Sequence, residues 1–345
     1  MKNKSIVSII LVLILAIVFI FNFTNEKNNN QVQIDNASKA RSIESHKLEN
    51  DKKSTVKEET DKKDFSDKNA VNKNTKDTNR NEAIAKEQDS INISSSTVTS
   101  VPWENDENFK KAQEKYGTHI MMCAYCAVLN DPLPGEEENV HVGAKLLCGT
   151  LVEPSKVFSQ NRTIGPYIQS RGYKKGPTYE GSHLTETIGG GVCKIASTLY
   201  NVAIMGNLPI VERHAHCMPV SYVPYGQDAT VCYGSLDFRF KNNTDSSILI
   251  WSQGIDNRLY IGFYGKSKPP KVEWHHQVLS SKKTSKVYKT NKSLSSNEEK
   301  LVVTGMDGAI IKSWITIENP DGTIQTKQLG ESRYLPLPYI YERRS

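Results

Sequence analysis

The sequence predicts an α+β fold in which an amphipathic helix packs on a β-sheet and a small β-rich module follows. Ile195, Leu199, Val202 and Met205 recur at the spacing of one helix face. Short apolar runs near the C-terminus are separated by Asp-Gly pairs, which favour tight hairpin turns. From Trp103 onward, aromatic residues, glycines and alternating apolar residues become frequent, which is typical of a globular domain.

The first 23 residues have the pattern of a membrane segment. Lys2 and Lys4 precede an apolar run, residues 6–23, which would span about 27 Å as a helix, close to the thickness of the hydrocarbon core. A removable signal peptide is the alternative, but no small-x-small cleavage site follows the run. We therefore expect a signal anchor, with residues 1–5 in the cytoplasm and the bulk of the chain outside the cell membrane, in the cell wall space.

Residues 24–98 are dominated by Lys, Glu, Asp, Asn and Ser, and Phe65 is the one aromatic residue among them. Acidic and basic side chains nearly balance, and too little apolar surface is present to offset the entropy of ordering. We expect a disordered tether that holds the following domain away from the membrane. The formal net charge of +6 therefore belongs mostly to the rest of the chain, and it suits a surface rich in anionic polymer. No nucleic-acid signature is present, so no nucleic-acid partner is expected.

Six cysteines follow the tether. Cys123 and Cys126 have the CxxC spacing. This spacing is compatible with a strained disulfide, with half a zinc site or with no special role. No second CxxC or HxxxH accompanies them, so we expect no metal ion, and no cofactor is indicated.

A change of composition near residue 266 divides the globular part into a domain at 99–266 and a section at 267–345. The second section contains three short strand-like runs, with Asp307-Gly308 and Asp321-Gly322 between them. Both dipeptides predict hairpins. This section could adhere to the wall or to glycan, or it could only extend the packing of the preceding domain.

Cys193 follows three glycines and lies in the first turn of a helix predicted over residues 192–205. Backbone N–H groups at a helix start favour an anion, and the thiolate is the nucleophilic form of cysteine. Gly190 and Gly191 permit close approach of a substrate, and their N–H groups are candidates for an oxyanion hole. The alternative is a tight entry turn with Cys193 packed inside.

Residues 210–216 are predicted as the next strand, which would place Glu212, His214 and His216 on one face. Either histidine could accept the thiol proton, with a slight preference for His216. Asp228 is the first candidate to orient that base, and Asp237 is the second. A metal half-site and a purely structural histidine pair are the alternatives.

The central segments resemble the VanW family of bacterial cell-envelope proteins. The motifs that carry the resemblance are Gly189-Gly190-Gly191-Val192-Cys193, Ser197-Thr198-Leu199-Tyr200-Asn201, Glu212-Arg213-His214-Ala215-His216, Tyr222-Val223-Pro224, Tyr233-Gly234-Ser235-Leu236-Asp237 and Lys241-Asn242-Asn243-Thr244-Asp245. Three residues depart from the family pattern. Lys194 replaces a glutamine, Ala196 a serine and Cys217 a serine. The C-terminal section loosely resembles the small G5-like modules that follow VanW domains.

This resemblance implies an L,D-transpeptidase that forms 3-3 cross-links between peptidoglycan stem peptides. Cys193 would be the nucleophile, with His216, His214 and Asp228 as the other catalytic candidates. Lys194 and Arg213 join the two glycines as candidate substrate or oxyanion contacts. A cysteine hydrolase of the same polymer and a non-catalytic protein of wall binding or envelope assembly are the alternatives.

Overall fold

The computed structural model describes residues 95–130, 132–180 and 183–344, all of which belong to one compact unit, residues 72–345. The predicted cytoplasmic end, the anchor at 6–23 and residues 24–94 of the tether lie outside the described residues. The end of the tether, predicted to be disordered to residue 98, is ordered instead, because Ser96 and Thr97 pair with a strand of the largest sheet. Among those that are described, no helix is long and apolar enough to cross a membrane. The predicted division near residue 266 falls between two strands, and it stays a prediction.

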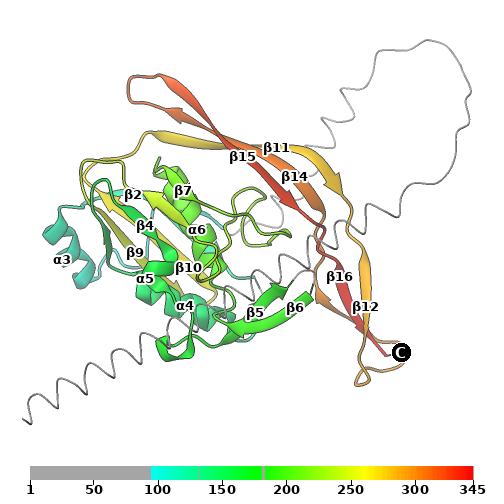
Figure 1. Ribbon diagram of the computed structural model, residues 1–345. Helices are drawn as coiled ribbons and strands as arrows, with labels where there is room; N and C mark the ends of the chain where they lie inside the picture. Colours follow the sequence, from blue (N-terminus) through cyan, green and yellow to red (C-terminus); the bar gives the residue numbers. More distant parts are fainter. Residues whose placement is uncertain (1–94, 131, 181–182, 345) are drawn as a thin grey trace, which may run out of the picture. The chain divides into compact units, whose positions relative to one another are not determined.

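The largest sheet is antiparallel and has five strands. In spatial order these are β1 (Ser96–Thr97), β2 (Ile120–Val128), β10 (Arg258–Gly265), β9 (Ile248–Ile255) and β3 (Thr150–Val152). Three helices pack against it, α3 (Glu107–Tyr116), α4 (Glu136–Leu147) and α6 (Cys193–Met205). Figure 1 shows α4 and α6 lying over these strands.

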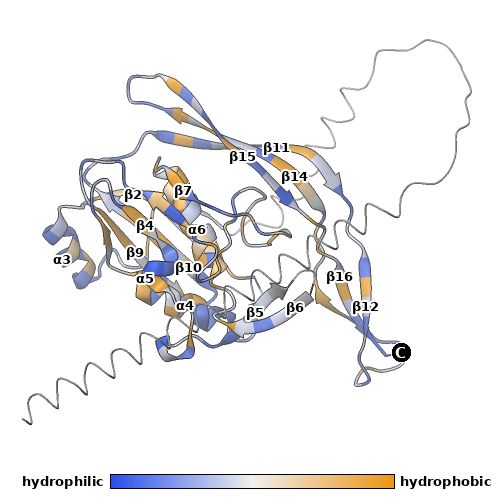
Figure 2. Ribbon diagram, viewed as in Figure 1, coloured by the Kyte–Doolittle hydropathy of each residue, from blue (hydrophilic) through white to orange (hydrophobic). Residues whose placement is uncertain are grey.

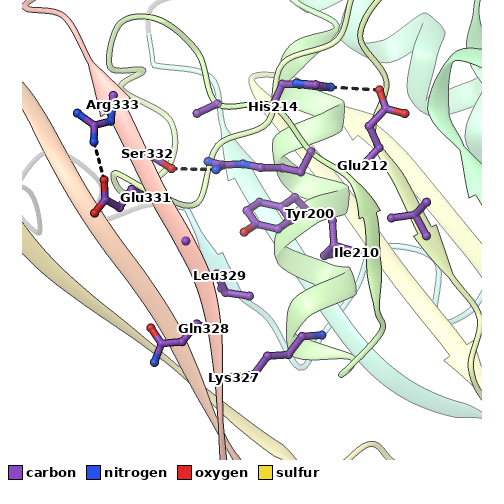
Figure 3. Close-up of a pocket in the computed structure, with 14 residues that line it drawn as sticks. Tyr200, Ile210, Glu212, His214, Lys327, Gln328, Leu329, Glu331, Ser332 and Arg333 are labelled. Atoms are coloured by element: carbon purple, nitrogen blue, oxygen red, sulfur yellow. Dashed lines mark hydrogen bonds and ion pairs between the residues drawn. The ribbon is translucent and has the colours of Figure 1, made fainter.

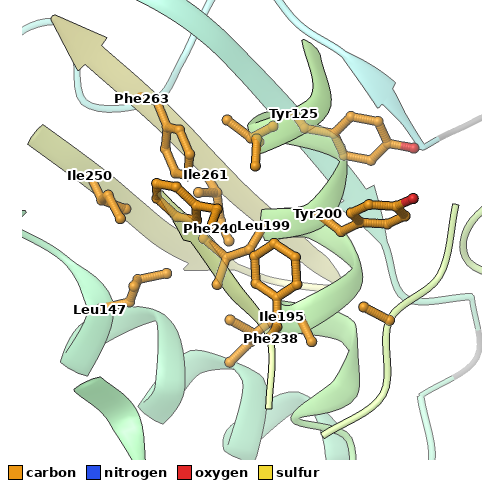
Figure 4. Close-up of a cluster of buried hydrophobic side chains, with 14 of the residues drawn as sticks. Tyr125, Leu147, Ile195, Leu199, Tyr200, Phe238, Phe240, Ile250, Ile261 and Phe263 are labelled. Carbon is orange, nitrogen blue, oxygen red and sulfur yellow. The ribbon is translucent and has the colours of Figure 1, made fainter. Parts of the chain in front are cut away.

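The two faces of this sheet are covered by different cores, because side chains along a strand alternate between faces. Tyr125 and Ala127 of β2 belong to the main core with Ile195 and Leu199 of α6. Ala124, which precedes Tyr125 and lies on the opposite face, belongs to a smaller cluster around Trp103 and the start of α3. Figure 4 shows the main core, in which aromatic rings from the strands lie against the apolar face of the helix.

Helix α6 follows from the apolar spacing in its sequence. Ile195, Leu199 and Val202 are fully buried on the face that packs on β2 and β10. The helix ends at Met205, where Gly206 bonds back to the carbonyl of Val202 and the predicted stop occurs.

Smaller elements surround α6. They are β4 (Val157–Ser159), α5 (Gln160–Ile164), the 3-10 turn η1 (Gln169–Arg171), β5 (Lys175–Glu180), β6 (His183–Ile188), β7 (Ile210–Glu212) and β8 (Arg239–Lys241). Strands β4, β8 and β7 form one sheet, and β5 and β6 form a hairpin. The predicted strand at 210–216 is wrong beyond Glu212, because a register irregularity interrupts its pairing with β8 and His214 instead forms an isolated bridge with Thr230.

The C-terminal section forms two three-stranded sheets. One has the order β11 (Lys271–Lys282), β14 (Gly308–Glu318), β15 (Ile324–Tyr334), and the other β12 (Lys286–Thr290), β16 (Tyr339–Arg343), β13 (Glu299–Val303). Every second residue of β14 from Ala309 to Ile317 is buried, and Figure 2 shows hydrophilic and hydrophobic segments along these strands.

One of the two predicted hairpins in this section is present. Strands β14 and β15 are joined at Asp321-Gly322, where Gly322 has a φ of 81° and Asp321 accepts a hydrogen bond from the Thr323 amide. This prediction is confirmed. The hairpin predicted at Asp307-Gly308 is absent, and this prediction is wrong. The strand before it, β13, pairs with β16, whereas the strand after it, β14, pairs with β11 and β15.

The CxxC pair lies within β2 rather than in a loop. Residues three apart in a strand point to opposite faces, so Cys123 and Cys126 cannot bind one metal ion or bond to each other without breaking the strand. All six cysteines are free thiols. Burial raises the pKa of Cys123 to about 12, which leaves it an inert core residue.

Candidate active site

Cys193 is the first residue of α6, and the turn before it is built from glycines. Gly189 and Gly191 have φ values of 82° and 100°, in the region that favours glycine. The carbonyl of Gly189 accepts from the Val192 amide, and that of Gly191 accepts from the Lys194 amide. The turn therefore runs into the helix without a side-chain cap and leaves the thiol at the helix start.

Gly190 serves the close packing of this turn. A Cβ atom at Gly190 would lie 2.1 Å from the carbonyl oxygen of Gly176, so no larger residue fits. Its carbonyl accepts a hydrogen bond from Asn139, and its N–H donates to the carbonyl of Thr187. This amide, a candidate oxyanion donor, already has an internal partner.

Two neighbouring backbone N–H groups lack a hydrogen-bond partner among the described residues. Within the described part of the chain, the N–H groups of Gly191 and Cys193 donate to no other group. Backbone N–H groups without a partner at the start of a helix are the usual donors to an anion. A developing oxyanion beside the sulphur could therefore be bound by these two groups.

The half-buried sulphur of Cys193 lies against the segment that follows Asp228. It is 3.4 Å from the hydroxyl of Thr230, accepts from the Val231 amide at 3.5 Å and lies 3.6 Å from the Val231 carbonyl. The ring of His216 also lies close enough to this sulphur to change its pKa.

The pKa of Cys193 results from opposing effects. Burial raises it, but the hydrogen bond to His216 and the charge of that ring lower it, and the pKa falls to about 7. The contacts with Thr230 and Val231 lower it further in the same direction. The thiol is therefore poised to ionise near neutral pH.

His216 is held by Asp228 through two hydrogen bonds. Its ring Nδ1 and its backbone N both lie 2.7 Å from Oδ2 of Asp228. With Nδ1 directed at the carboxylate, Nε2 is the ring atom left for the sulphur of Cys193. The three side chains therefore lie in a row, with the imidazole between the thiol and the carboxylate.

The same contacts set the protonation states of this row. Burial lowers the pKa of His216, but the bonds to Asp228 and Cys193 outweigh it and raise that pKa to about 9. Burial raises the pKa of Asp228, but the contact with His216 and the charge of Arg213 lower it to about 2. Because the pKa of the ring exceeds that of the thiol, a thiolate–imidazolium pair is favoured near neutral pH.

The second oxygen of Asp228 is held by residues that lie far away in the sequence. Oδ1 accepts from the Tyr334 hydroxyl at 2.5 Å and from Arg213 Nη2 at 2.9 Å. Arg213 also donates to the Asp228 carbonyl and to the hydroxyl of Ser332. Its guanidinium, a candidate substrate contact, is thus directed at protein groups.

The structure separates the two candidate histidines. His214 pairs with Glu212 at 3.1 Å, and its side chain is 41% exposed, whereas His216 lies beside the thiol and lowers its pKa. Asp237, the second candidate to orient the base, accepts from Ser159 and from the Asn161 amide at the start of α5. It supports that helix and does not contact either histidine in the described hydrogen bonds.

Lys194 pairs with a carboxylate. Its ammonium pairs with Glu136 at the start of α4 and lies 4.7 Å from the centroid of the Tyr222 ring. Of the other two departures from the family pattern, Ala196 is fully buried in α6, and Cys217 is exposed and bonds through its carbonyl to the Leu335 amide.

Several residues of this site were not among the candidates predicted from the sequence. Thr230 and Val231 lie two and three residues after Asp228, and their nearness to that candidate is a signal that could have found them. Tyr334 and Ser332 have no such local signal, because their contacts span more than 100 residues.

Comparison with known proteins identifies the domain. Residues 135–264 match the family described as VanW like protein. The chain is 36% identical over 140 residues to the uncharacterized protein YoaR of Bacillus subtilis, which covers 41% of this chain and 46% of YoaR. It is 32% identical over 139 residues to the vancomycin B-type resistance protein VanW of Enterococcus faecalis, covering 39% of this chain and 50% of that protein.

The chain thus spans about half the length of the curated relatives it matches. The matched segment holds Cys193, His216 and Asp228, together with the helix and strands that position them. Residues 135–264 of this chain therefore form a VanW-like domain.

Proposed function

We propose that this protein is a cysteine acyltransferase of the cell wall, an L,D-transpeptidase that joins peptidoglycan stem peptides. The observation that supports this most is the row of Cys193, His216 and Asp228, in which the imidazole lies between the thiol and the carboxylate. The amides of Gly191 and Cys193 beside the sulphur add a second requirement of acyl transfer, which is stabilisation of an oxyanion.

In the first half of the reaction, the thiolate of Cys193 attacks the carbonyl carbon that precedes the terminal D-alanine of a donor stem. The negative charge moves to the carbonyl oxygen, which the two amides bind. The C–N bond then breaks, and the imidazolium of His216 gives its proton to the departing amine of D-alanine. A thioester remains on Cys193, and His216 is neutral.

In the second half, the amine of an acceptor stem attacks the thioester. His216 takes the proton that this amine loses, the new C–N bond forms, and the C–S bond breaks to restore the thiolate. Asp228 keeps Nδ1 of His216 protonated throughout, so Nε2 alone exchanges protons. One peptide bond replaces another, so the reaction consumes no nucleotide.

We place this reaction outside the cell membrane. The apolar run at 6–23 would anchor the chain, and residues 24–94 would let the domain reach the wall. Peptidoglycan is the proposed partner of the domain, and the membrane is the proposed partner of the N-terminal segment.

The test uses the purified full chain and a tetrapeptide-stem muropeptide, with mass spectrometry of both protein and products. We expect an acyl adduct on Cys193 and a cross-linked dimer, neither of which forms with Cys193→Ala. Loss of D-alanine without a dimer would indicate a hydrolase instead. Equal product from Cys193→Ala would refute the mechanism, and no product from either protein would favour a non-catalytic wall-binding role.

A further inference from the structure

A cleft of about 620 Å³ lies between β15 and the segment that contains β7 (Figure 3). Tyr200 of α6 lines it between these two walls. One wall is residues 210–215, and the other is residues 327–333. The first wall ends one residue before His216, so the cleft borders the proposed active site. Its volume is typical of ligand sites.

The walls present strand edges rather than strand faces. Side chains alternate along a strand, so a pocket on a sheet face is lined by every second residue. Here six consecutive residues line one wall and seven consecutive residues line the other. Such continuous lining arises when the main chain itself faces the cleft.

Sheet topology agrees with this geometry. β7 is the last strand of the order β4-β8-β7, and β15 is the last strand of the order β11-β14-β15. No main-chain hydrogen bond joins residues 210–215 to residues 327–333 in the described part of the chain. The last strands of two sheets, β7 and β15, therefore border one cleft, and the outer edges of such strands accept an added strand.

The cleft is closed at one end and irregular along one wall. The bond from Arg213 to the Ser332 hydroxyl, 2.8 Å, ties the two walls together near His216. Leu329 of β15 has no partner in the register with β14. Gly330 lies opposite Ser313, and Gln328 lies opposite Trp314. Gly330 has a φ of 91°, so the skipped residue is a β-bulge, a feature common beside active sites.

The charges that line the cleft favour an anionic group at its other end. Glu212 pairs with His214, Glu331 with Arg333, and Arg213 with Asp228. Lys327 is exposed and forms none of the ion pairs found among the described residues. It is thus the lining cation left to meet a carboxylate of a ligand.

We propose that this cleft binds an extended, carboxylate-bearing peptide as an added strand between β7 and β15. This rests on the proposed function, because the peptide would be the part of a stem remote from the reacting carbonyl. Tyr200 follows Cys193 by seven residues, two turns of α6, so the cleft lies about 10 Å along the helix from the sulphur. Main-chain hydrogen bonds provide affinity, and Lys327 contacts the carboxylate.

The test measures binding without turnover. Full-length protein carrying Cys193→Ala is titrated against a fluorescent tetrapeptide-stem muropeptide, and anisotropy reports the dissociation constant. In this background, Val211→Trp places an indole in the cleft from an exposed position, and Lys327→Glu reverses the unpaired charge. Lys282→Glu, an exposed lysine of β11 outside the cleft, is the matched control.

We expect each cleft variant to weaken binding about tenfold or more and the control to leave it unchanged. Peptides methylated on single backbone nitrogens should bind about fivefold more weakly at the positions that pair with an edge. Absence of binding, or binding that neither cleft variant weakens, would overturn the inference. The two failures are distinguishable. If binding depends on the cleft but the wild-type protein forms no adduct on Cys193, the cleft is supported and the transpeptidase is refuted.

Discussion

Tyr334 donates a 2.5 Å hydrogen bond to Asp228, a residue 106 positions earlier in the chain. Its hydroxyl also accepts the Gly226 amide at 2.8 Å. Asp228 in turn bonds to His216 through its other oxygen. A residue at the end of β15 thus fixes the carboxylate that orients the proposed base, and the C-terminal section is part of the site.

Tyr334→Phe should lower both stability and thiol reactivity. The substitution leaves a buried amide at Gly226 and a buried oxygen of Asp228 without this partner, which costs about 1–3 kcal/mol in the free energy of unfolding. The freed carboxylate also holds His216 less firmly, so Cys193 should react more slowly with iodoacetamide at pH 7. Urea unfolding and mass spectrometry measure the two effects.

Tyr339→Phe is the matched control for this variant. Tyr339 belongs to the same section and stacks on Tyr341, but its hydroxyl makes no hydrogen bond among the described residues. If Tyr334→Phe unfolds and reacts as Tyr339→Phe does, the link to Asp228 has no energetic role.

Local sequence pattern predicts the parts of this fold whose causes are local. The apolar spacing of α6 and the turn chemistry of Asp321-Gly322 act within a few residues, and both predictions match the structure. The turn at Asp307-Gly308 has the same chemistry, but the strand before it pairs with β16 instead. Which strands pair with each other depends on packing between residues far apart in the sequence, and a turn dipeptide alone does not determine it.

The same distinction applies to the site. Cys193, His216 and Asp228 could be proposed from their motifs, and the structure brings all three into contact. The strand expected at 210–216 would have placed His214 and His216 on one face, but regular pairing ends at Glu212 and the two rings separate. The role of Tyr334 depends on the path of β15, for which no local pattern exists.

The pH dependence of thiol alkylation should identify Cys193. Its lowered pKa predicts that the rate of modification by iodoacetamide rises with a midpoint near pH 7. His216→Ala removes the hydrogen bond and charge that oppose burial, so the midpoint should move above pH 9. His214→Ala, the matched control, should leave it near pH 7. A midpoint unchanged in His216→Ala would contradict the thiolate–imidazolium pair.

Cross-linking activity should distinguish the same two histidines. Loss of a general base typically lowers the rate by about 10²–10⁴-fold, and we expect this for His216→Ala. His214→Ala should change the rate by a few-fold at most, because its ring pairs with Glu212 instead of the thiol. Partial recovery of His216→Ala by added imidazole would show that a base is missing. Equal losses in both variants would argue against the assignment.

The buried pair of Lys194 and Glu136 should be strongly coupled in stability. Both side chains are only 12% exposed, so removing one leaves a charge with little access to water. In a double-mutant cycle with Lys194→Met and Glu136→Gln, we expect a coupling of about 0.5–3 kcal/mol by urea unfolding. The exposed pair of Lys174 and Glu138, 3.8 Å apart, is the control and should give at most about 1 kcal/mol. Similar small couplings in both cycles would show that the buried contact is not favourable.

The contribution of Asp228 to stability should disappear in acid. Its pKa is lowered from 3.8 to about 2 in the folded protein, so the folded state favours the carboxylate. This stabilisation is present above the unfolded pKa and is lost as pH falls through about 2. A shift of this size corresponds to about 2 kcal/mol. The difference in unfolding free energy between wild type and Asp228→Asn should therefore shrink by about that amount between pH 5 and pH 2. Asp256→Asn, at an exposed turn, controls for removal of a carboxylate, and a constant difference for Asp228→Asn would show that its carboxylate is not specifically stabilised.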